Sequence, residues 1–185
     1  MALDETYLKQ ELSKLIDGNY VDFLGYPSSV LDAIVNWTNM YDAYASKAQD
    51  QSGDVLLHAN KEGFQSALGT LASSVSADAA ARAFDNAFLA YWSGATFAVG
   101  ILPSGGIGGT GVFSVESTSI AVAKSDILYN ELFAVFSAVY EDAQTAINTL
   151  ANAFHKSTLT GVSIVITGLD TSPTPVTITN TGSPS

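Results

Sequence analysis

An apolar stripe near the end of the chain constrains this fold more than any other feature. It keeps a period close to 3.6 residues for about 30 residues, which is the spacing of one face of an α-helix. Ser125 and Asp126 precede it and are suited to open a helix. The pattern predicts one continuous helix over 126–155, roughly 45 Å long at ~1.5 Å per residue. Its apolar positions are Leu128, Leu132, Val135, Phe136, Val139, Ala143, Ile147, Leu150 and Phe154.

Four further helices are expected upstream, over 4–17, 29–50, 59–74 and 77–93. Asp4 and Ser76 stand where N-cap residues are needed, Pro27 with Ser28 and Ser29 announces the second helix, and Asp17 with the glycine after it ends the first. The helix over 77–93 carries its own stripe, and we expect it to share a single core with the helix over 126–155. The fold class is therefore mainly α, a helical bundle of four to five helices with a minor β element. The second stripe consists of Ala80, Phe84, Ala87, Phe88, Tyr91 and Trp92.

The β element is expected in two places. Apolar and polar side chains alternate over part of residues 112–123, and many of these side chains are β-branched, which favours one or two short strands. After Ser157 the chain carries one ionisable side chain, Asp170, and 161–169 and 175–179 are typical of strands. We divide the chain into a helical domain over 1–156, with a glycine-rich loop inserted at 94–111, and a β-rich arm or hairpin over 157–185. Pairing of that arm within its own chain or with another chain is left open.

The glycine-rich loop contains a match to the dinucleotide-binding pattern G-x-G-x-x-G at 106–111. That chemistry needs a strand before the first glycine and a helix starting at the last one. Here Pro103 marks a turn before the match, and strand-like residues follow it. No lysine or arginine lies between Arg82 and Lys124 to assist a phosphate. We therefore expect no cofactor, and interpret the glycines as allowing positive φ and close approach of a neighbouring subunit.

Catalytic and metal-binding patterns are also missing. The chain has no cysteine and two histidines: His58 in a connector, and His155 in the expected last turn of the long helix, where a cation complements the helix dipole. Adjacent carboxylates such as Glu141 and Asp142 point roughly 100° apart on a helix and do not form a shared site. No metal-ligand spacing and no G-x-S-x-G turn occurs. We expect no catalytic residue, no bound metal and no enzymatic activity.

The charge balance excludes further classes of function. With a net charge of −11 and seven lysines and arginines, the chain cannot build a basic face for nucleic acid or anionic lipid. No apolar run is long enough for a membrane span, and the charged, amphipathic start is unlike a secretory signal, so folding in the cytoplasm is expected. Charged residues amount to 14 %, which leaves a neutral polar surface that suits packing against other copies.

Two kinds of residue are candidates for contacts between subunits. Aromatic side chains and glycines mark the glycine-rich loop, and β-branched side chains mark the expected C-terminal strands. The candidates are Tyr91, Trp92, Gly106, Gly108, Gly111, Val162, Ile164, Ile166, Val176 and Ile178.

The cysteine-free, Ala/Ser/Thr/Gly-rich composition and the segment ELFAVFSAVYEDAQTAINTLANAFHKSTLTGVSIVITGLD, a helix running into a β-rich tail, resemble virion structural proteins of tailed bacteriophages. The likeness is to small neck, connector, tail and baseplate proteins. It implies a non-enzymatic ring or collar subunit that sends an extended terminus to a neighbour. Its partners would be other copies of itself and other virion proteins, in a virion assembled in the host cytoplasm. The acidic charge would suit a DNA channel.

The alternative to an assembly subunit is a small soluble enzyme or ligand-binding bundle with a pocket near Trp92 and the glycine-rich loop.

Overall fold

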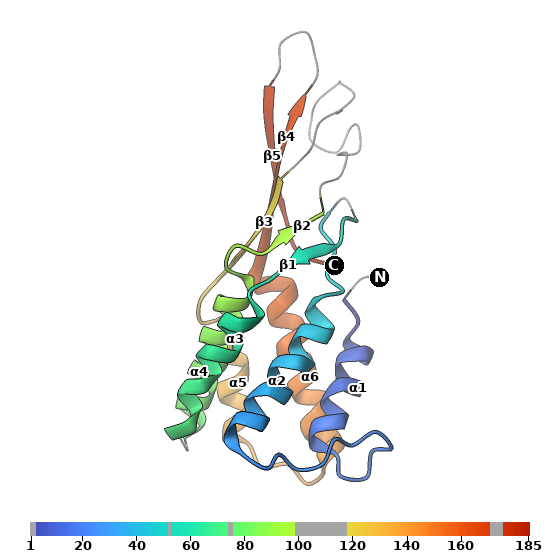
Figure 1. The fold of residues 1–185 in the computed structure, drawn as a ribbon, viewed down its shortest axis with the longest axis vertical. Coiled ribbons are helices and arrows are strands. Elements are labelled where there is room, and N and C mark those ends of the chain that lie inside the picture. Colours follow the sequence, from blue (N-terminus) through green and yellow to red (C-terminus); the bar gives the residue numbers. More distant parts are fainter. Residues whose placement is uncertain (1–2, 52, 74–75, 99–117, 171–175) are drawn as a thin grey trace.

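The computed structural model describes residues 3–51, 53–73, 76–98, 118–170 and 176–185, and its main body is a bundle of helices (Figure 1). Six α-helices form within these residues, together with a short 3₁₀ helix after the third. The α-helices are α1 (Glu5–Ile16), α2 (Val30–Ala45), α3 (Lys61–Leu68), α4 (Ala77–Trp92), α5 (Ile127–Ser137) and α6 (Ala143–Gly161), and the 3₁₀ helix is η1 (Gly69–Ser73). The prediction of a mainly helical chain is confirmed.

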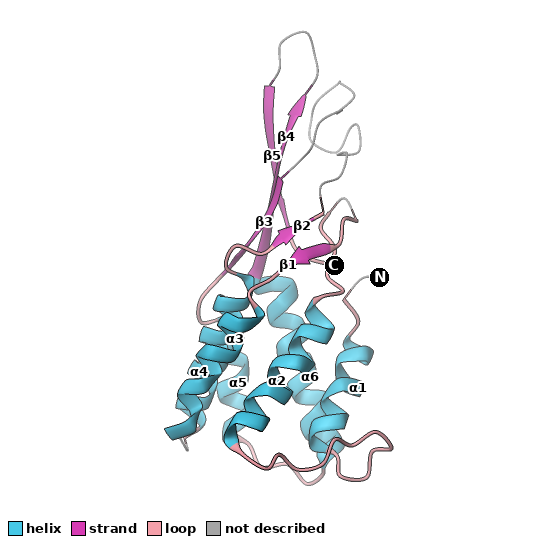
Figure 2. Cartoon of the chain, viewed as in Figure 1, coloured by secondary structure: helices cyan, strands magenta, loops and turns pink. Residues whose placement is uncertain are grey.

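An antiparallel sheet of five strands covers one end of the bundle (Figure 2). The strands are β1 (Leu56–His58), β2 (Thr96–Phe97), β3 (Thr118–Ala123), β4 (Val162–Asp170) and β5 (Val176–Gly182), in the order β1-β2-β3-β4-β5. β4 and β5 form a hairpin that extends away from the helices along the long axis of the molecule (Figure 1). The C-terminal segment thus pairs within its own chain in this structure.

Helix starts follow the expected caps. The Asp4 carboxylate accepts the Thr6 backbone N–H at 2.8 Å, and the Ser29 and Ser76 hydroxyls cap α2 and α4 at 3.1 Å. α2 ends at Ala45, short of the expected 50. The chain turns there so that the backbone of Gln49 can exchange two hydrogen bonds of 3.0 Å with Ser185, beside the sheet.

The expected continuous helix over 126–155 is wrong, because the chain breaks between Ser137 and Ala143. The carboxylate of Asp142 caps α6, accepting the backbone N–H and the hydroxyl of Thr145 at 2.7 and 2.9 Å. These hydrogen bonds lower the pKa of Asp142. Val139, an expected stripe position, is 98 % exposed in the break. The two halves of the stripe pack against each other as α5 and α6, which raises the helix count to six.

The position expected for His155 is also corrected. α6 continues to Gly161, so His155 lies well inside the helix, and its Nδ1 is 2.7 Å from the Tyr44 hydroxyl oxygen. β4 then begins at Val162, with no loop between the helix and the strand. Gly161 allows this junction to pack closely, since a Cβ there would lie 3.2 Å from the Ile127 side chain.

Two strands appear where none were expected. β1 has three residues and β2 has two, inside segments interpreted as a connector and as the glycine-rich loop. Of the expected strand region 112–123, β3 covers 118–123. Residues 99–117, which hold most of the expected loop, lie outside the described residues.

A single core joins the helices to the inner face of the sheet. Aromatic rings fill its centre: Tyr41 stacks on Phe64 with ring centroids 5.0 Å apart, and Trp37 meets Phe84 edge-on at 5.1 Å. The prediction that the stripes of 77–93 and 126–155 share one core is confirmed, since α4, α5 and α6 all contribute to it.

Candidate functional site

A buried polar network ties α2, α4 and α6 together. The indole Nε1–H of Trp92 donates to the Tyr41 hydroxyl at 2.8 Å, and that hydroxyl lies 3.1 Å from Oγ1 of Thr158. Thr158 donates its own proton to the Phe154 carbonyl at 2.9 Å. Tyr41 therefore donates to Thr158, and each proton has an acceptor. All three side chains are buried, so the network sets the relative position of three helices and faces no solvent.

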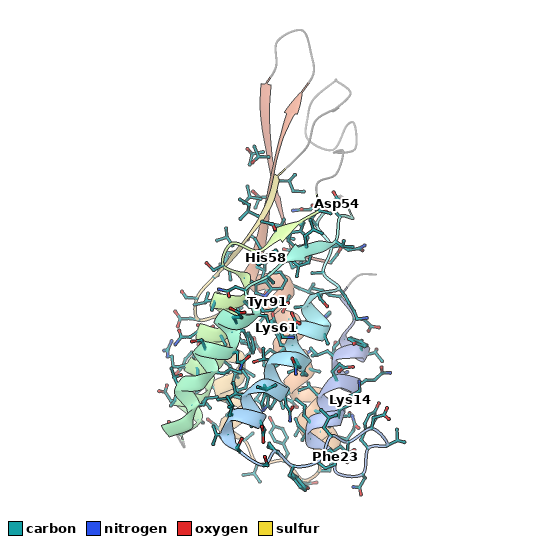
Figure 3. All side chains as sticks on the ribbon, in the orientation of Figure 1. Lys14, Phe23, Asp54, His58, Lys61 and Tyr91 are labelled. Carbon is teal, nitrogen blue, oxygen red and sulfur yellow. The ribbon has the colours of Figure 1, made fainter. Side chains whose placement is uncertain are left out.

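Two more tyrosines, Tyr44 and Tyr91, lie beside this network and form hydrogen bonds of their own, Tyr44 with His155 at 2.7 Å. Tyr91 donates to the Asp42 carboxylate at 2.9 Å, and Lys61 approaches the other carboxylate oxygen at 2.8 Å. Figure 3 shows Tyr91 and Lys61 lying close to one another. Burial raises the pKa of Tyr41, Tyr44 and Tyr91, and the charge of Asp42 raises that of Tyr91 further. All three phenols therefore stay protonated at neutral pH.

A second group of titratable side chains lies at the start of α5, where Arg82 pairs with Asp126 at 2.5 Å and the Tyr129 hydroxyl donates to Asp78 at 2.7 Å. Among the described residues, no three His, Asp or Glu side chains lie close enough together to hold a metal ion. His58 lies in β1 and His155 in α6. Within the same part of the chain, no helix combines the length and apolar character of a membrane span.

The ten interface candidates fall into three groups. Tyr91, Trp92 and the β4 residues are at most 1 % exposed and belong to the core of their own chain; the β4 residues are Val162, Ile164 and Ile166. Val176 and Ile178 lie in β5, opposite Asp170 and Gly168. Gly106, Gly108 and Gly111 lie outside the described residues.

The outer half of the β4–β5 hairpin extends past the rest of the sheet. The β3–β4 ladder ends where Thr118 pairs with Thr167. Beyond that point three further residue pairs join β4 only to β5, the last of them Asp170 with Val176. Among the described strands, β5 has a neighbour on one side only. Its sequence, VTITNTG, contains no charge and no proline.

The outer face of the sheet is apolar at its centre. On β3, Ile120 and Val122 are 46 % and 53 % exposed, while Ala121 between them points into the core. A shallow hollow of about 350 Å³ lies beside them, next to the end of α4. It is lined by Leu89, Ser93, Gly94 and residues 120–123.

A second apolar surface lies at the end of the bundle away from the sheet, on the connection between α1 and α2 (Figure 1). We call it the loop surface. Its side chains are exposed in the isolated chain, although the loop itself is ordered by backbone hydrogen bonds such as Leu24 N–H to the Lys14 carbonyl at 2.9 Å. The loop surface consists of Val21 (89 % exposed), Leu24 (61 %), Tyr26 (82 %), Val30 (54 %) and Leu31 (63 %).

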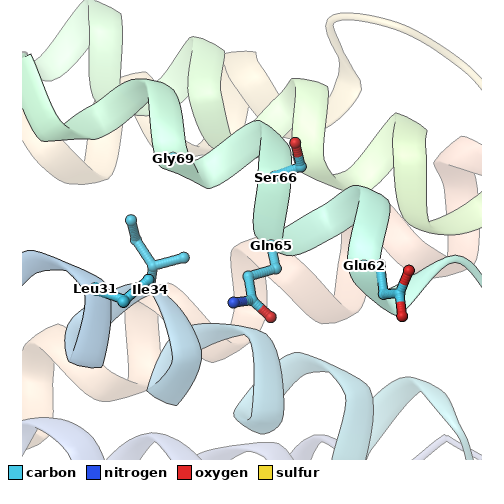
Figure 4. A pocket seen from close by; sticks show the side chains of 6 residues that line it. All are labelled: Leu31, Ile34, Glu62, Gln65, Ser66 and Gly69. Carbon is cyan, nitrogen blue, oxygen red and sulfur yellow. The ribbon is translucent and has the colours of Figure 1, made fainter.

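A groove between α2 and α3 adjoins the loop surface at Leu31 (Figure 4). Its volume is about 400 Å³. Leu31 and Ile34 form the apolar wall on α2, and Glu62, Gln65 and Ser66 form the polar wall on α3, with Gly69 at the end. One apolar wall and one polar wall, the latter carrying the carboxylate of Glu62, suit an elongated ligand that is itself amphipathic.

Sequence reasoning did not single out the loop surface or the groove. A signal was present in composition: Val21, Leu24 and Tyr26 stand in a connector, where apolar side chains have no helix face to bury. No lysine or arginine occurs from 15 to 46. Together these features indicate an apolar surface with an acidic border.

Comparison with family models, curated proteins and solved structures finds no match to this chain. Functional inference therefore rests on the surfaces described above.

Proposed function

We propose that this chain is a non-enzymatic structural assembly subunit that pairs its β4–β5 hairpin with neighbouring subunits. The setting we propose is a tailed-phage virion, at the head–tail junction or in the tail. The observation that carries the proposal is the outer half of the hairpin, whose strands pair only with each other within the described residues.

A two-stranded hairpin that stands alone is marginally stable in water. Among the described residues, no third strand supports the outer half as β3 supports the inner half. A strand from another subunit, added along β5, would supply backbone hydrogen bonds and a continuous sheet. The assembled state would then stabilise the hairpin in a way that the single chain does not.

The chemistry of β5 supports pairing. Edge strands of monomeric proteins are usually protected by lysine, proline or a bulge. β5 has none of these, and its register with β4 is regular from Ile164–Gly182 to Asp170–Val176.

The test shortens the hairpin without touching the bundle. Replacing 168–178 with Asn-Gly joins Thr167 to Thr179, which already face each other, through a two-residue turn. We expect the full chain to form oligomers by sedimentation velocity over about a hundredfold range of concentration. The shortened chain should keep its helical circular dichroism and sediment as a monomer.

Val139→Ser serves as the control, because Val139 is fully exposed at the far end of the bundle and should leave assembly unchanged. A shortened chain that assembles as well as the full chain would contradict the role of the hairpin. The glycine-rich loop is tested separately: replacing Gly106, Gly108 and Gly111 with alanine should impair assembly and leave the bundle folded.

A further inference from the structure

We propose that the loop surface and the adjoining α2–α3 groove together dock a cationic amphipathic segment of a partner protein. This surface lies at the opposite end of the molecule from the hairpin (Figure 1). The inference does not rest on hairpin pairing, and either contact can fail without the other.

Exposure of the apolar side chains is the first argument. Five apolar side chains within an eleven-residue stretch, from Val21 to Leu31, are each more than half exposed. Phe23 packs edge-on against Tyr26 with ring centroids 5.2 Å apart, so the loop holds a defined shape. Apolar side chains gathered in one short, ordered stretch of chain and exposed to this degree indicate a contact site.

The shape of the site is the second argument. Leu31, at the start of α2, is the residue of the loop surface that also lines the groove, whereas Leu24 lies on the α1 side of α2, beside Glu11 and Lys14. A groove between two neighbouring helices matches the way an amphipathic helix is bound, with its apolar face inward. The Leu31 and Ile34 wall would receive that face, and the Glu62 wall would receive its polar edge.

Charge selects the partner. Asp17, Asp22 and Asp32 lie in or next to the same stretch of sequence as the loop surface, and Glu62 lines the groove. Lys14, which lies beside Leu24, is already paired with Glu11 at 2.6 Å. Hydrogen bonds from Ser28 and Ser29 lower the pKa of Asp32, so this carboxylate is ionised at neutral pH. The one lysine next to the groove, Lys61, is already paired with Asp42 at 2.8 Å. A partner that covers the apolar area must therefore bring cations to the border.

A second copy of the chain has too few unpaired cations to complement the acidic residues at this site. The chain has eighteen carboxylate side chains against seven lysines and arginines. Five of those seven cations form ion pairs within the chain, with Glu5, Glu11, Asp42, Asp126 and Glu131. Self-association here would bring acidic borders together, and an anionic lipid surface would be repelled for the same reason.

The test uses a fluorescent peptide of about 18 residues that forms an amphipathic helix of leucine and lysine. A matched peptide has glutamate in place of each lysine and the same apolar face. We expect the lysine peptide to bind the full chain, as measured by fluorescence anisotropy. Its affinity should fall as the salt concentration is raised. The glutamate peptide should not bind.

Variants separate specific docking from general attraction to an acidic protein. Leu31→Ser should weaken binding about five- to tenfold, since it removes one buried leucine from the contact. Leu57→Ser is the matched control, because Leu57 is 66 % exposed, close to the 63 % of Leu31, but lies in β1 at the sheet end. It should leave binding unchanged.

A second pair of variants tests the border. Asp22→Asn with Glu62→Gln removes two negative charges at the site and should weaken binding at low salt. Glu5→Gln with Glu131→Gln removes two charges elsewhere and should have little effect. Circular dichroism checks that each variant is folded.

Four results would overturn the proposal. The first is equal binding of both peptides, or of neither. The second is equal weakening by the site and control variants. The third is a dimer in sedimentation that Leu31→Ser dissociates and the lysine peptide does not compete with, which would assign the surface to a second copy. The fourth is co-sedimentation with vesicles of about four parts phosphatidylcholine to one part phosphatidylserine, abolished by Leu31→Ser, which would assign it to lipid.

Discussion

The carboxylate of Asp85, on α4, accepts a hydrogen bond of 3.1 Å from the backbone N–H of Tyr129, in the first turn of α5. Its other oxygen accepts the backbone N–H of Asp126, also at 3.1 Å. Asp126 itself stands at the N-cap position with φ of 63° and makes no side-chain cap. The start of α5 is therefore capped by a buried residue of a neighbouring helix.

Replacing Asp85 with alanine should destabilise the chain by about 2–3 kcal/mol. The change leaves two backbone N–H groups of a helix start without their acceptor, at a residue that is 3 % exposed. Urea unfolding followed by circular dichroism measures this. Asp126→Asn is the control, because asparagine also tolerates positive φ and the ion pair of Asp126 with Arg82 is exposed. If the two variants lose the same stability, Asp85 does not cap α5.

Tyr41→Phe should cost about 1–2 kcal/mol, because the indole N–H of Trp92 loses its acceptor inside the core. The ring itself remains, so its stacking on Phe64 is kept. Thermal and urea unfolding measure the change. Tyr26→Phe removes a hydroxyl from a side chain that is 82 % exposed and should leave stability unchanged.

Stability should fall steeply in alkali. The pKa of Tyr41, Tyr44 and Tyr91 is raised from 10.0, chiefly by burial, so above pH 10 only the unfolded chain releases these protons. Their contribution is fully present below pH 10 and declines as the pH rises, by about 1.4 kcal/mol per pH unit for each tyrosine. Tyrosinate absorbance and circular dichroism, followed from about pH 8 to about pH 12, should change together for these three groups. Ionisation of all the tyrosines without unfolding would contradict their burial.

Val139→Ser should change the free energy of unfolding by less than about 0.5 kcal/mol, whereas Val135→Ser should cost about 2 kcal/mol or more. Val139 is 98 % exposed between α5 and α6, and Val135, one helical turn earlier, is 6 % exposed. Equal losses of stability for the two variants would contradict the break and favour the single long helix that the apolar period predicts.

The sequence predicts those features that depend only on residues close together in the chain. Side chains at Asp4, Ser29 and Ser76 cap the helices they precede, because a cap needs only the backbone a few residues away. The break after Ser137 was missed because no glycine or proline marks it and the apolar period continues through Val139. Its one local signal was Asp142 followed by Thr145, the pair that caps α6.

Features that depend on distant residues could not be inferred. β1 and β2 are too short to show alternation, and they form because β2 pairs with β3 and β1 pairs in turn with β2. Asp85 appeared as one polar residue in a helix, and its role required knowing that Tyr129 lies beside it. The β4 residues Ile164 and Ile166 were expected at an interface, and the structure places them in the core of their own chain.

The direct passage from Gly161 in α6 to Val162 in β4 also has a mechanical consequence. With no loop at the junction, a force that pulls on the hairpin reaches the helix without slack. The six residue pairs between β3 and β4 run along the direction of such a pull, so their hydrogen bonds share the load and must break together. We therefore expect the hairpin and α6 to respond to such a pull as one connected element.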